Sequence, residues 1–134
     1  MRTLKPFLLA TDLGFIAYWA VTSFPLIPLS YLFKDYADPL LVAWNWSFLP
    51  LDICISATGL ASMGLYRKGC PSWSALALVS LALTVCSGLQ ALAFWAIRAD
   101  LALAWWAPNL FLVIYPLFFI PRLLFGGEGR IGRR

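Results

Sequence analysis

The chain has 134 residues, of which 62% are hydrophobic and only 12% are charged, and its net charge is +4. Soluble domains carry about 25% charged residues, so composition excludes a water-soluble fold and predicts one all-α domain that is integral to a membrane. Most basic residues flank apolar segments, where they orient membrane proteins, and they do not indicate nucleic-acid binding.

Several classes of chemistry are disfavoured by the residues that the chain lacks. Histidine is absent, and the three cysteines (Cys54, Cys70 and Cys86) form no CxxC pair. Histidine is the commonest metal ligand and general base, and redox thiols usually come in close pairs. We therefore expect no metal, no other cofactor and no thiol redox activity.

The first predicted span covers residues 6–24, close to the ~20 residues that cross a bilayer, and Pro25 and Pro28 end it. It carries Asp12 and lacks a small-residue cleavage site, so we expect it to remain as a span and not act as a signal peptide. Residues 25–38 stay apolar, which predicts an interfacial or partly re-entrant loop.

The second predicted span covers residues 39–66. Asp38 followed by Pro39 is a strong helix-start signal, with aspartate at the N-cap and proline at the first helical position. Pro50 is expected to kink this span one turn after Trp46. Asp52 follows inside the same apolar segment, where an unpaired carboxylate costs several kcal/mol.

The third and fourth predicted spans cover residues 73–97 and 103–125. In the third, Ser80, Thr84 and Gly88 form one narrow face that favours close helix packing. The expected architecture is therefore a four-helix bundle over residues 1–125, followed by a basic, glycine-rich disordered tail over 126–134.

The distribution of basic residues predicts the orientation. Lys34 and Arg98 fall on one side of the expected spans. The remaining basic residues fall on the other side: Arg2, Lys5, Arg67, Lys68, Arg122, Arg130, Arg133 and Arg134. By the positive-inside rule both termini are cytoplasmic. Trp44, Trp46, Trp105 and Trp106 are then expected at the outer interface, although Trp46 and Trp95 could instead face a pocket.

Three carboxylates, Asp12, Asp38 and Asp52, are the candidate ligand-binding acids, because no Lys or Arg lies in the interior of a span to neutralise them. Asp12 and Asp52 lie on antiparallel spans, so they can meet at one depth and share a proton. Such a pocket suits a lipid or an amphiphilic amine, bound through a charge-assisted hydrogen bond and aromatic contacts. The further candidate ligand-binding residues are Asn45, Trp46, Gln90 and Asn109.

Each of these polar residues also has a structural interpretation. Asp38 is accounted for by an N-cap, and Asp12 by snorkelling to the interface or by bonding a backbone group. Asn45, Gln90 and Asn109 are accounted for by hydrogen bonds between helices, worth about 0.6–2 kcal/mol each. Asp52, in the middle of a span, is the hardest to explain without a pocket.

These features together resemble the EXPERA superfamily, which contains the sigma-2 receptor and the emopamil-binding sterol isomerase. The matching features are the first-span acid Asp12, the pair Asp38-Pro39, the stretch from Trp44 to Asp52, and Lys68-Gly69-Cys70 before Trp73. The resemblance implies that Asp12 binds a cation, that Asp38 supports Asp12 and that Asp52 is an additional acid. The isomerase branch uses a His and Glu pair, and this chain has no His and no Glu within a span.

The run from Asn45 to Asp52 also resembles small bacterial membrane proteins grouped as YvaD-like, which implies a multi-pass protein of the bacterial inner membrane. The function expected first is a pocket for a lipid or an amphiphilic cation. The alternatives are a lipid isomerase that uses Asp52 with Asp12 or Asp38, a proton-coupled exporter that works as a homodimer, and a scaffold or subunit without a ligand. Catalytic residues are not assigned.

Overall fold

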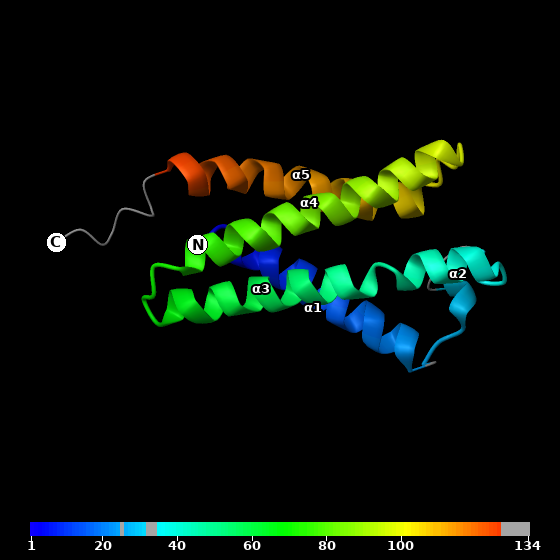
Figure 1. The fold of residues 1–134 in the computed structure, drawn as a ribbon, viewed down its shortest axis with the longest axis horizontal. Helices are drawn as coiled ribbons and strands as arrows, with labels where there is room; N and C mark the ends of the chain where they lie inside the picture. Colours follow the sequence, from blue (N-terminus) through cyan, green and yellow to red (C-terminus); the bar gives the residue numbers. More distant parts are fainter. Residues whose placement is uncertain (25, 32–34, 127–134) are drawn as a thin grey trace.

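The computed structural model of the chain describes residues 1–24, 26–31 and 35–126. Regular structure in these ranges is helical, without a β-strand, which confirms the all-α prediction (Figure 1). The elements are α1 (Lys5–Ser23), the 3-10 helix η1 (Leu29–Tyr31), α2 (Pro39–Trp46), α3 (Leu49–Arg67), α4 (Trp73–Ile97) and α5 (Leu103–Phe125). Pro25, Lys34 and the tail residues 127–134 lie outside the described residues.

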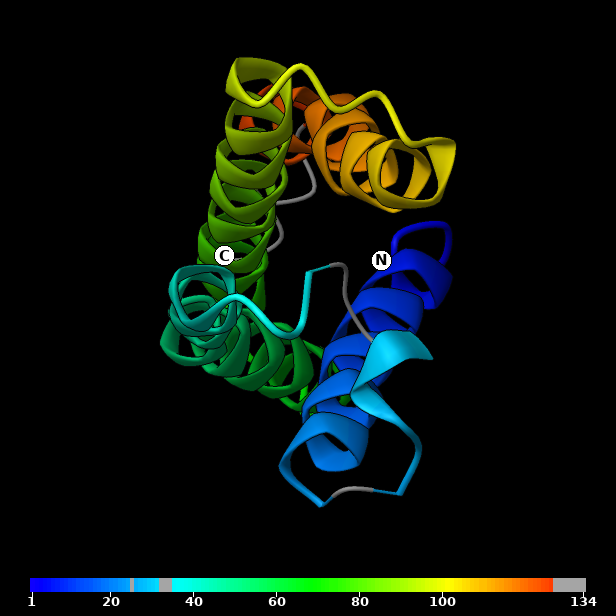
Figure 2. The ribbon, with the colours of Figure 1, turned by 90° about the vertical axis from the view of Figure 1, so that its right-hand side faces the viewer.

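The four long helices form a bundle in which α1 packs against α3, α3 against α4, and α4 against α5. Viewed end-on, they surround a common axis in the order α1, α3, α4, α5 (Figure 2). α1 and α5 complete the ring through side chains. Phe7 stacks on Tyr115 with ring centroids 5.4 Å apart, and Thr11 Oγ1 donates a hydrogen bond of 2.9 Å to Tyr115 Oη.

Three helical stretches are long and apolar enough to cross a membrane. They are Pro39–Arg67 with 29 residues, which combines α2 and α3, then α4 with 25 residues and α5 with 23 residues. α1 is shorter, at 19 residues, and lies in the same bundle. The predicted integral membrane bundle is thus confirmed in architecture, and the crossing by the first segment stays a prediction.

The second predicted span is divided into two helices. α2 begins as expected, with Asp38 at the N-cap accepting a hydrogen bond of 2.9 Å from the Leu40 amide and with Pro39 in the first turn. It ends at Trp46, and α3 starts two residues after Ser47 with Pro50 in its first turn. The expected kink at Pro50 is therefore wrong in place: the break lies at Ser47–Phe48, because a proline fits a helix start without clashing.

The two ends of the bundle differ in charge. The start of α1, the turn between α3 and α4, and the end of α5 all lie at one end (Figure 1). This end, which we call the basic end, carries Arg2, Lys5, Arg67, Lys68 and Arg122, all exposed. At the opposite end, Arg98 forms an ion pair with Asp35 at 3.6 Å.

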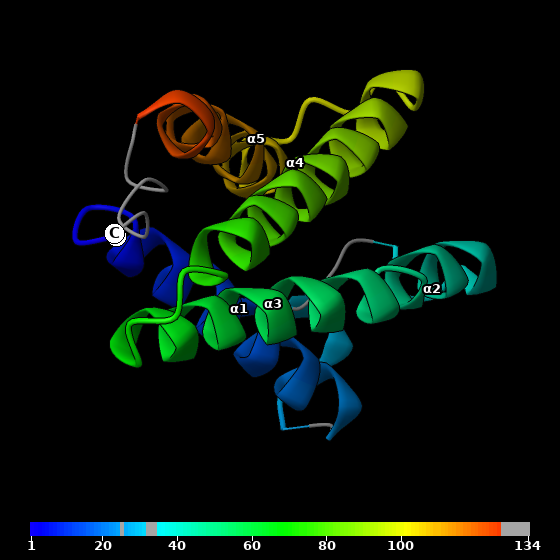
Figure 3. The same cartoon turned by 60° about the vertical axis from the view of Figure 1, so that its left-hand side comes forward.

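The hydrophobic core is densest towards the basic end, where Leu4, Leu8, Ala77 and Leu81 are buried beside Tyr115. From the α3–α4 turn the two helices diverge towards the opposite end, where α2 lies (Figure 3). The predicted narrow face of α4 is buried, and a Cβ at Gly88 would lie 2.8 Å from the carbonyl oxygen of Asn109. Close packing at one end and divergence at the other leave room for a pocket.

Candidate functional site

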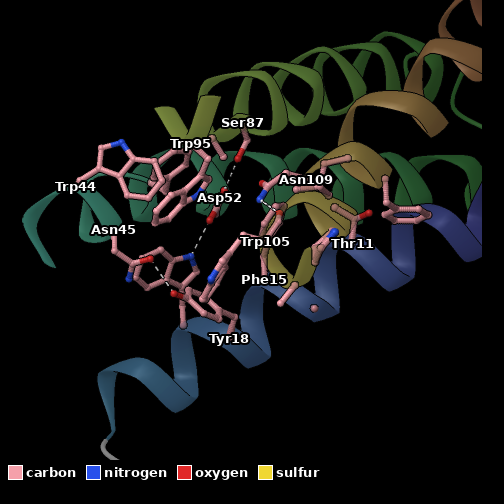
Figure 4. Close-up of a pocket in the computed structure, with 18 of the residues that line it drawn as sticks. Thr11, Phe15, Tyr18, Trp44, Asn45, Asp52, Ser87, Trp95, Trp105 and Asn109 are labelled. Carbon is pink, nitrogen blue, oxygen red and sulfur yellow. Dashed lines mark hydrogen bonds between the residues drawn. The ribbon is translucent and has the colours of Figure 1, made fainter. Parts of the chain in front are cut away.

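A pocket of about 480 Å³ lies in the half of the bundle away from the basic end, and α1 to α5 all contribute to it (Figure 4). Its polar side chains come from Thr11, Tyr18, Asn45, Asp52, Ser87 and Asn109. Its aromatic side chains come from Phe15, Tyr18, Trp19, Trp44, Phe48, Trp95, Trp105 and Phe111. We call this cavity the Asp52 pocket, because Asp52 supplies the only carboxylate among its described lining residues.

Asp52 is held in place by donors from two other helices. It lies in the first turn of α3 and is 4% exposed. Trp19 on α1 donates an indole hydrogen bond of 2.9 Å to Oδ2, and Ser87 on α4 donates one of 3.3 Å to Oδ1 (Figure 4). Both donors and the N-terminal end of a helix stabilise negative charge. A carboxylate can accept about four hydrogen bonds, so Asp52 can still accept one from a ligand.

The aromatic side chains form a wall on the side of α2 and α4. Trp44 stacks on Phe94 with centroids 4.0 Å apart and meets Trp95 edge-on at 5.7 Å. Trp95 in turn stacks on Trp105 of α5 at 6.1 Å. Aromatic faces carry partial negative charge and attract organic cations. The wall can therefore contact both the apolar body and the charged group of an amphiphile.

Two side-chain amides also line the Asp52 pocket. Asn45 Oδ1 accepts a hydrogen bond of 2.8 Å from the Tyr18 hydroxyl, whereas its buried Nδ2 has no partner among the described residues. Asn109 Nδ2 donates to the Trp105 carbonyl at 2.7 Å, within its own helix. Asn45 Nδ2 thus offers both of its N–H donors to a ligand, whereas one of the two on Asn109 Nδ2 is already engaged.

The Asp52 pocket reaches the surface of the bundle between α1 and α5. Its lining residues on these helices include small or compact ones that are exposed: Ala10, Gly14, Ala104 and Pro108. We call this place the side opening. The residues around the side opening belong to the apolar outer surface of α1 and α5.

Asp12 lies apart from the pocket. It is fully buried, and neither carboxylate oxygen has a hydrogen-bond partner among the described residues. The carboxyl packs on the backbone of Gly59, where an added Cβ would overlap it. Ser56 Oγ donates a hydrogen bond of 3.2 Å to the main-chain carbonyl oxygen of Asp12. Gly59 lies seven residues beyond Asp52 on α3, about 10 Å along the axis. The expected proton-sharing contact between Asp12 and Asp52 is therefore absent from the described structure.

The other predicted residues divide between the pocket and the surface. Asn45 and Asn109 line the Asp52 pocket. Asp38 is exposed and acts as the N-cap of α2, and Gln90 is exposed on α4. Trp46 is 37% exposed, and its ring is tilted against that of Trp19 with centroids 5.4 Å apart, outside the lining of the pocket.

Sequence reasoning missed Trp19, Ser87 and Gly59. A signal for Trp19 exists, because it follows Asp12 by seven residues and so shares its helix face. Ser87 lies seven residues after Ser80, beside the predicted narrow face of α4. Gly59 carries no such signal. Among the described residues, no group of three or more His, Cys, Asp or Glu side chains could hold a metal ion.

A bundle of apolar helices around a buried acid-bearing pocket defines a small helical membrane protein. Within this class, the chain belongs to the "Family of unknown function (DUF5360)", which it matches over residues 4–130. It is similar to the "Uncharacterized protein YvaD" of Bacillus subtilis (strain 168), with 55% identity over 130 residues, 97% of this chain and 96% of the relative. The YvaD-like resemblance is thereby confirmed, and that relative is bacterial. No solved structure matches the chain.

Proposed function

We propose that this protein is a multi-pass protein of the bacterial inner membrane that binds a lipid or an amphiphilic organic cation in the Asp52 pocket. The observation that carries the proposal is the combination of one buried carboxylate with an aromatic wall in a cavity of about 480 Å³. Cavities of this kind bind small molecules. The described lining contains no Lys or Arg that would neutralise Asp52.

The ligand's charge is inferred from Asp52 and its shape from the side opening. An ammonium group gains a charge-assisted hydrogen bond to Asp52 and cation–π attraction from Trp44 or Trp105. An apolar chain attached to it can extend through the side opening into the bilayer. The resemblance to the EXPERA superfamily implies a cationic ligand bound by Asp12. Because Asp12 does not line the pocket, we propose Asp52 in that role.

The orientation that we propose places the basic end in the cytoplasm, in keeping with the positive-inside rule. The Asp52 pocket then lies in the outer half of the membrane.

Binding is favoured over lipid isomerisation by the composition of the lining. An isomerase with two carboxylates requires a second acid at the site, and among the described lining residues Asp52 is the sole one.

The test compares a long-chain tertiary amine with the alcohol of the same chain length, using purified protein in nanodiscs and thermal stability as the readout. The wild-type protein is expected to be stabilised more by the amine. Asp52→Asn should weaken amine binding by about 10- to 100-fold, because hydrogen bonds to charged groups contribute about 1.5–3 kcal/mol. Alcohol binding should change little.

Asp12→Asn is the matched control, because Asp12 is equally buried but does not line the pocket. Its amine affinity should equal that of the wild type. Trp105→Ala provides a second pocket variant, which shortens the aromatic wall without removing a buried charge. Equal loss of amine binding in Asp12→Asn and Asp52→Asn, or no preference for the amine in the wild type, would reject Asp52 as the cation-binding group.

A further inference from the structure

A second cavity lies at the basic end, well away from the Asp52 pocket. It has a volume of about 680 Å³ and is formed by the start of α1, the turn between α3 and α4, and the last turns of α5. We call it the basic pocket. Its lining residues are Met1, Arg2, Thr3, Leu4, Tyr66, Gly69, Pro71, Trp73, Phe119, Arg122, Leu123 and Gly126.

The basic pocket gathers positive charge from opposite ends of the chain. Arg2 precedes α1, and Arg122 lies in the last turn of α5. The guanidinium of Arg122 lies over the Phe119 ring at 5.8 Å, which orients it at the wall of the cavity. None of the described lining residues is acidic, and among the described residues neither arginine takes part in an ion pair.

The surroundings reinforce this charge. Lys5, Arg67 and Lys68 are exposed at the same end of the bundle, so their fields add to those of Arg2 and Arg122. At the opposite end, the described cation Arg98 is instead paired with Asp35. The basic pocket is therefore the concave part of the strongest positive region in the described structure.

The remaining wall is apolar and aromatic. Leu4, Phe119 and Leu123 supply aliphatic and ring surface, and Trp73 packs edge-on against Tyr66 with centroids 5.2 Å apart. Tryptophan and tyrosine are typical of the depth at which lipid headgroups meet acyl chains. The cavity thus places two guanidinium groups next to a surface that can contact hydrocarbon.

We propose that the basic pocket binds the phosphate group of an anionic membrane lipid, with Arg2 and Arg122 as its ligands. Guanidinium groups bind phosphate oxygens with two parallel hydrogen bonds, and they tolerate low-polarity surroundings better than ammonium groups do. Basic pockets between membrane helices bind anionic headgroups on the cytoplasmic side. The apolar wall would hold the first carbons of the acyl chains.

The site is independent of the Asp52 pocket in residues, charge and ligand. Its test uses the full chain in mixed micelles that contain phosphatidylglycerol and phosphatidylcholine, with native mass spectrometry to count each retained lipid. Arg2→Gln and Arg122→Gln remove one charge each and keep a long polar side chain. Lys5→Gln and Arg67→Gln are matched controls, since they remove the same charge at the same end outside the cavity.

The wild-type protein is expected to retain phosphatidylglycerol in preference to phosphatidylcholine. Each pocket variant should lower that preference about fivefold, which corresponds to the ~1 kcal/mol contributed by one cation near an anionic lipid. The controls should lower it less than the pocket variants do, because their charges act on the cavity only from outside it. Arg122→Lys keeps the charge without the bidentate geometry and should lie between wild type and Arg122→Gln.

A competition experiment with inorganic phosphate distinguishes a site for a lipid headgroup from a site for free phosphate. Displacement of phosphatidylglycerol by millimolar phosphate would support a site for the phosphate group alone. Retention of the lipid would support a site that also needs the acyl chains. Equal losses in Lys5→Gln, Arg67→Gln and the pocket variants would overturn the proposal in favour of a diffuse surface field, and so would a wild type without preference. Circular dichroism of each variant establishes that it is folded.

Discussion

Trp19 and Asp52 are joined by a hydrogen bond of 2.9 Å from the indole Nε1 to Oδ2, which ties the last third of α1 to the first turn of α3. Both side chains are buried, and both line the Asp52 pocket. The bond satisfies part of a carboxylate that is only 4% exposed, so its loss leaves a buried acceptor with one partner fewer. One contact therefore serves both the packing of the helices and the chemistry of the pocket.

Trp19→Phe should lower the free energy of unfolding by about 1.5–3 kcal/mol, because it removes a donor to a buried charged group and keeps most of the ring. Thermal unfolding in detergent measures the effect. Trp46→Phe is the control, since Trp46 is exposed beside Trp19. Equal effects of the two substitutions would show that the indole bond contributes little. In an Asp52→Leu background the cost of Trp19→Phe should shrink.

Gly59→Ala should destabilise the bundle by about 1–3 kcal/mol, because a Cβ at Gly59 overlaps the carboxyl of Asp12. Gly64→Ala is a matched control on the same helix, where an added Cβ meets nothing within 4 Å. That control should be neutral or stabilising by about 0.5–1 kcal/mol, since alanine favours a helix over glycine. Unfolding of both variants is compared by denaturant titration, and Asp12→Ala should rescue Gly59→Ala in part. Similar stabilities of Gly59→Ala and Gly64→Ala would contradict this packing.

Gly88→Ala should separate α4 from α5. The added Cβ would lie 2.8 Å from the Asn109 carbonyl oxygen and 2.9 Å from Val113 Cγ2, so the helices must move apart. We expect a loss of about 1–3 kcal/mol and a larger pocket, because Asn109 lines it. Gly14→Ala, with nothing within 4 Å of the added Cβ, is the control for the measurement of melting temperature. An unchanged melting temperature for Gly88→Ala would mean that this helix pair is not closely packed.

The proposed topology predicts a labelling pattern for cysteines. Cys70 lies in the turn between α3 and α4 at the basic end, whereas Cys54 and Cys86 are exposed on the apolar outer surface of the helices. A membrane-impermeant maleimide should leave all three unmodified in intact cells and modify Cys70 after the inner face is exposed. Leu101→Cys, in the loop at the opposite end, should react in intact cells. Reaction of Cys70 in intact cells would reverse the orientation.

The long helices were predictable because their ends carry local signals. Residues 73–97 and 103–125 were predicted as spans and are α4 and α5, and Asp38-Pro39 starts α2 as expected. The break at Ser47 was not located, since Pro50 is compatible with either a kink or a helix start. Local sequence signals therefore locate the starts of these helices more precisely than the break between α2 and α3.

The partners of the buried acids were not predictable, because they depend on the register between α1 and α3. In a lipid environment the outer face and the core of a helix are both apolar, so apolar periodicity does not define the inner face. Leu8 is buried and Leu13 is 54% exposed, although the two residue types are the same. The packing that sets Asp12 against Gly59 and Trp19 against Asp52 could therefore not be derived from the order of residues.

The side opening between α1 and α5 has a consequence for how occupancy of the Asp52 pocket should be measured. A ligand that enters from the bilayer is supplied at its concentration in lipid, which for an amphiphile far exceeds its concentration in water. Apparent affinity in buffer then multiplies two quantities, the partition coefficient of the compound and its intrinsic affinity for the site. Two amines that bind Asp52 equally well would differ in apparent potency by the ratio of their partition coefficients, and a weak site can be filled at low aqueous dose.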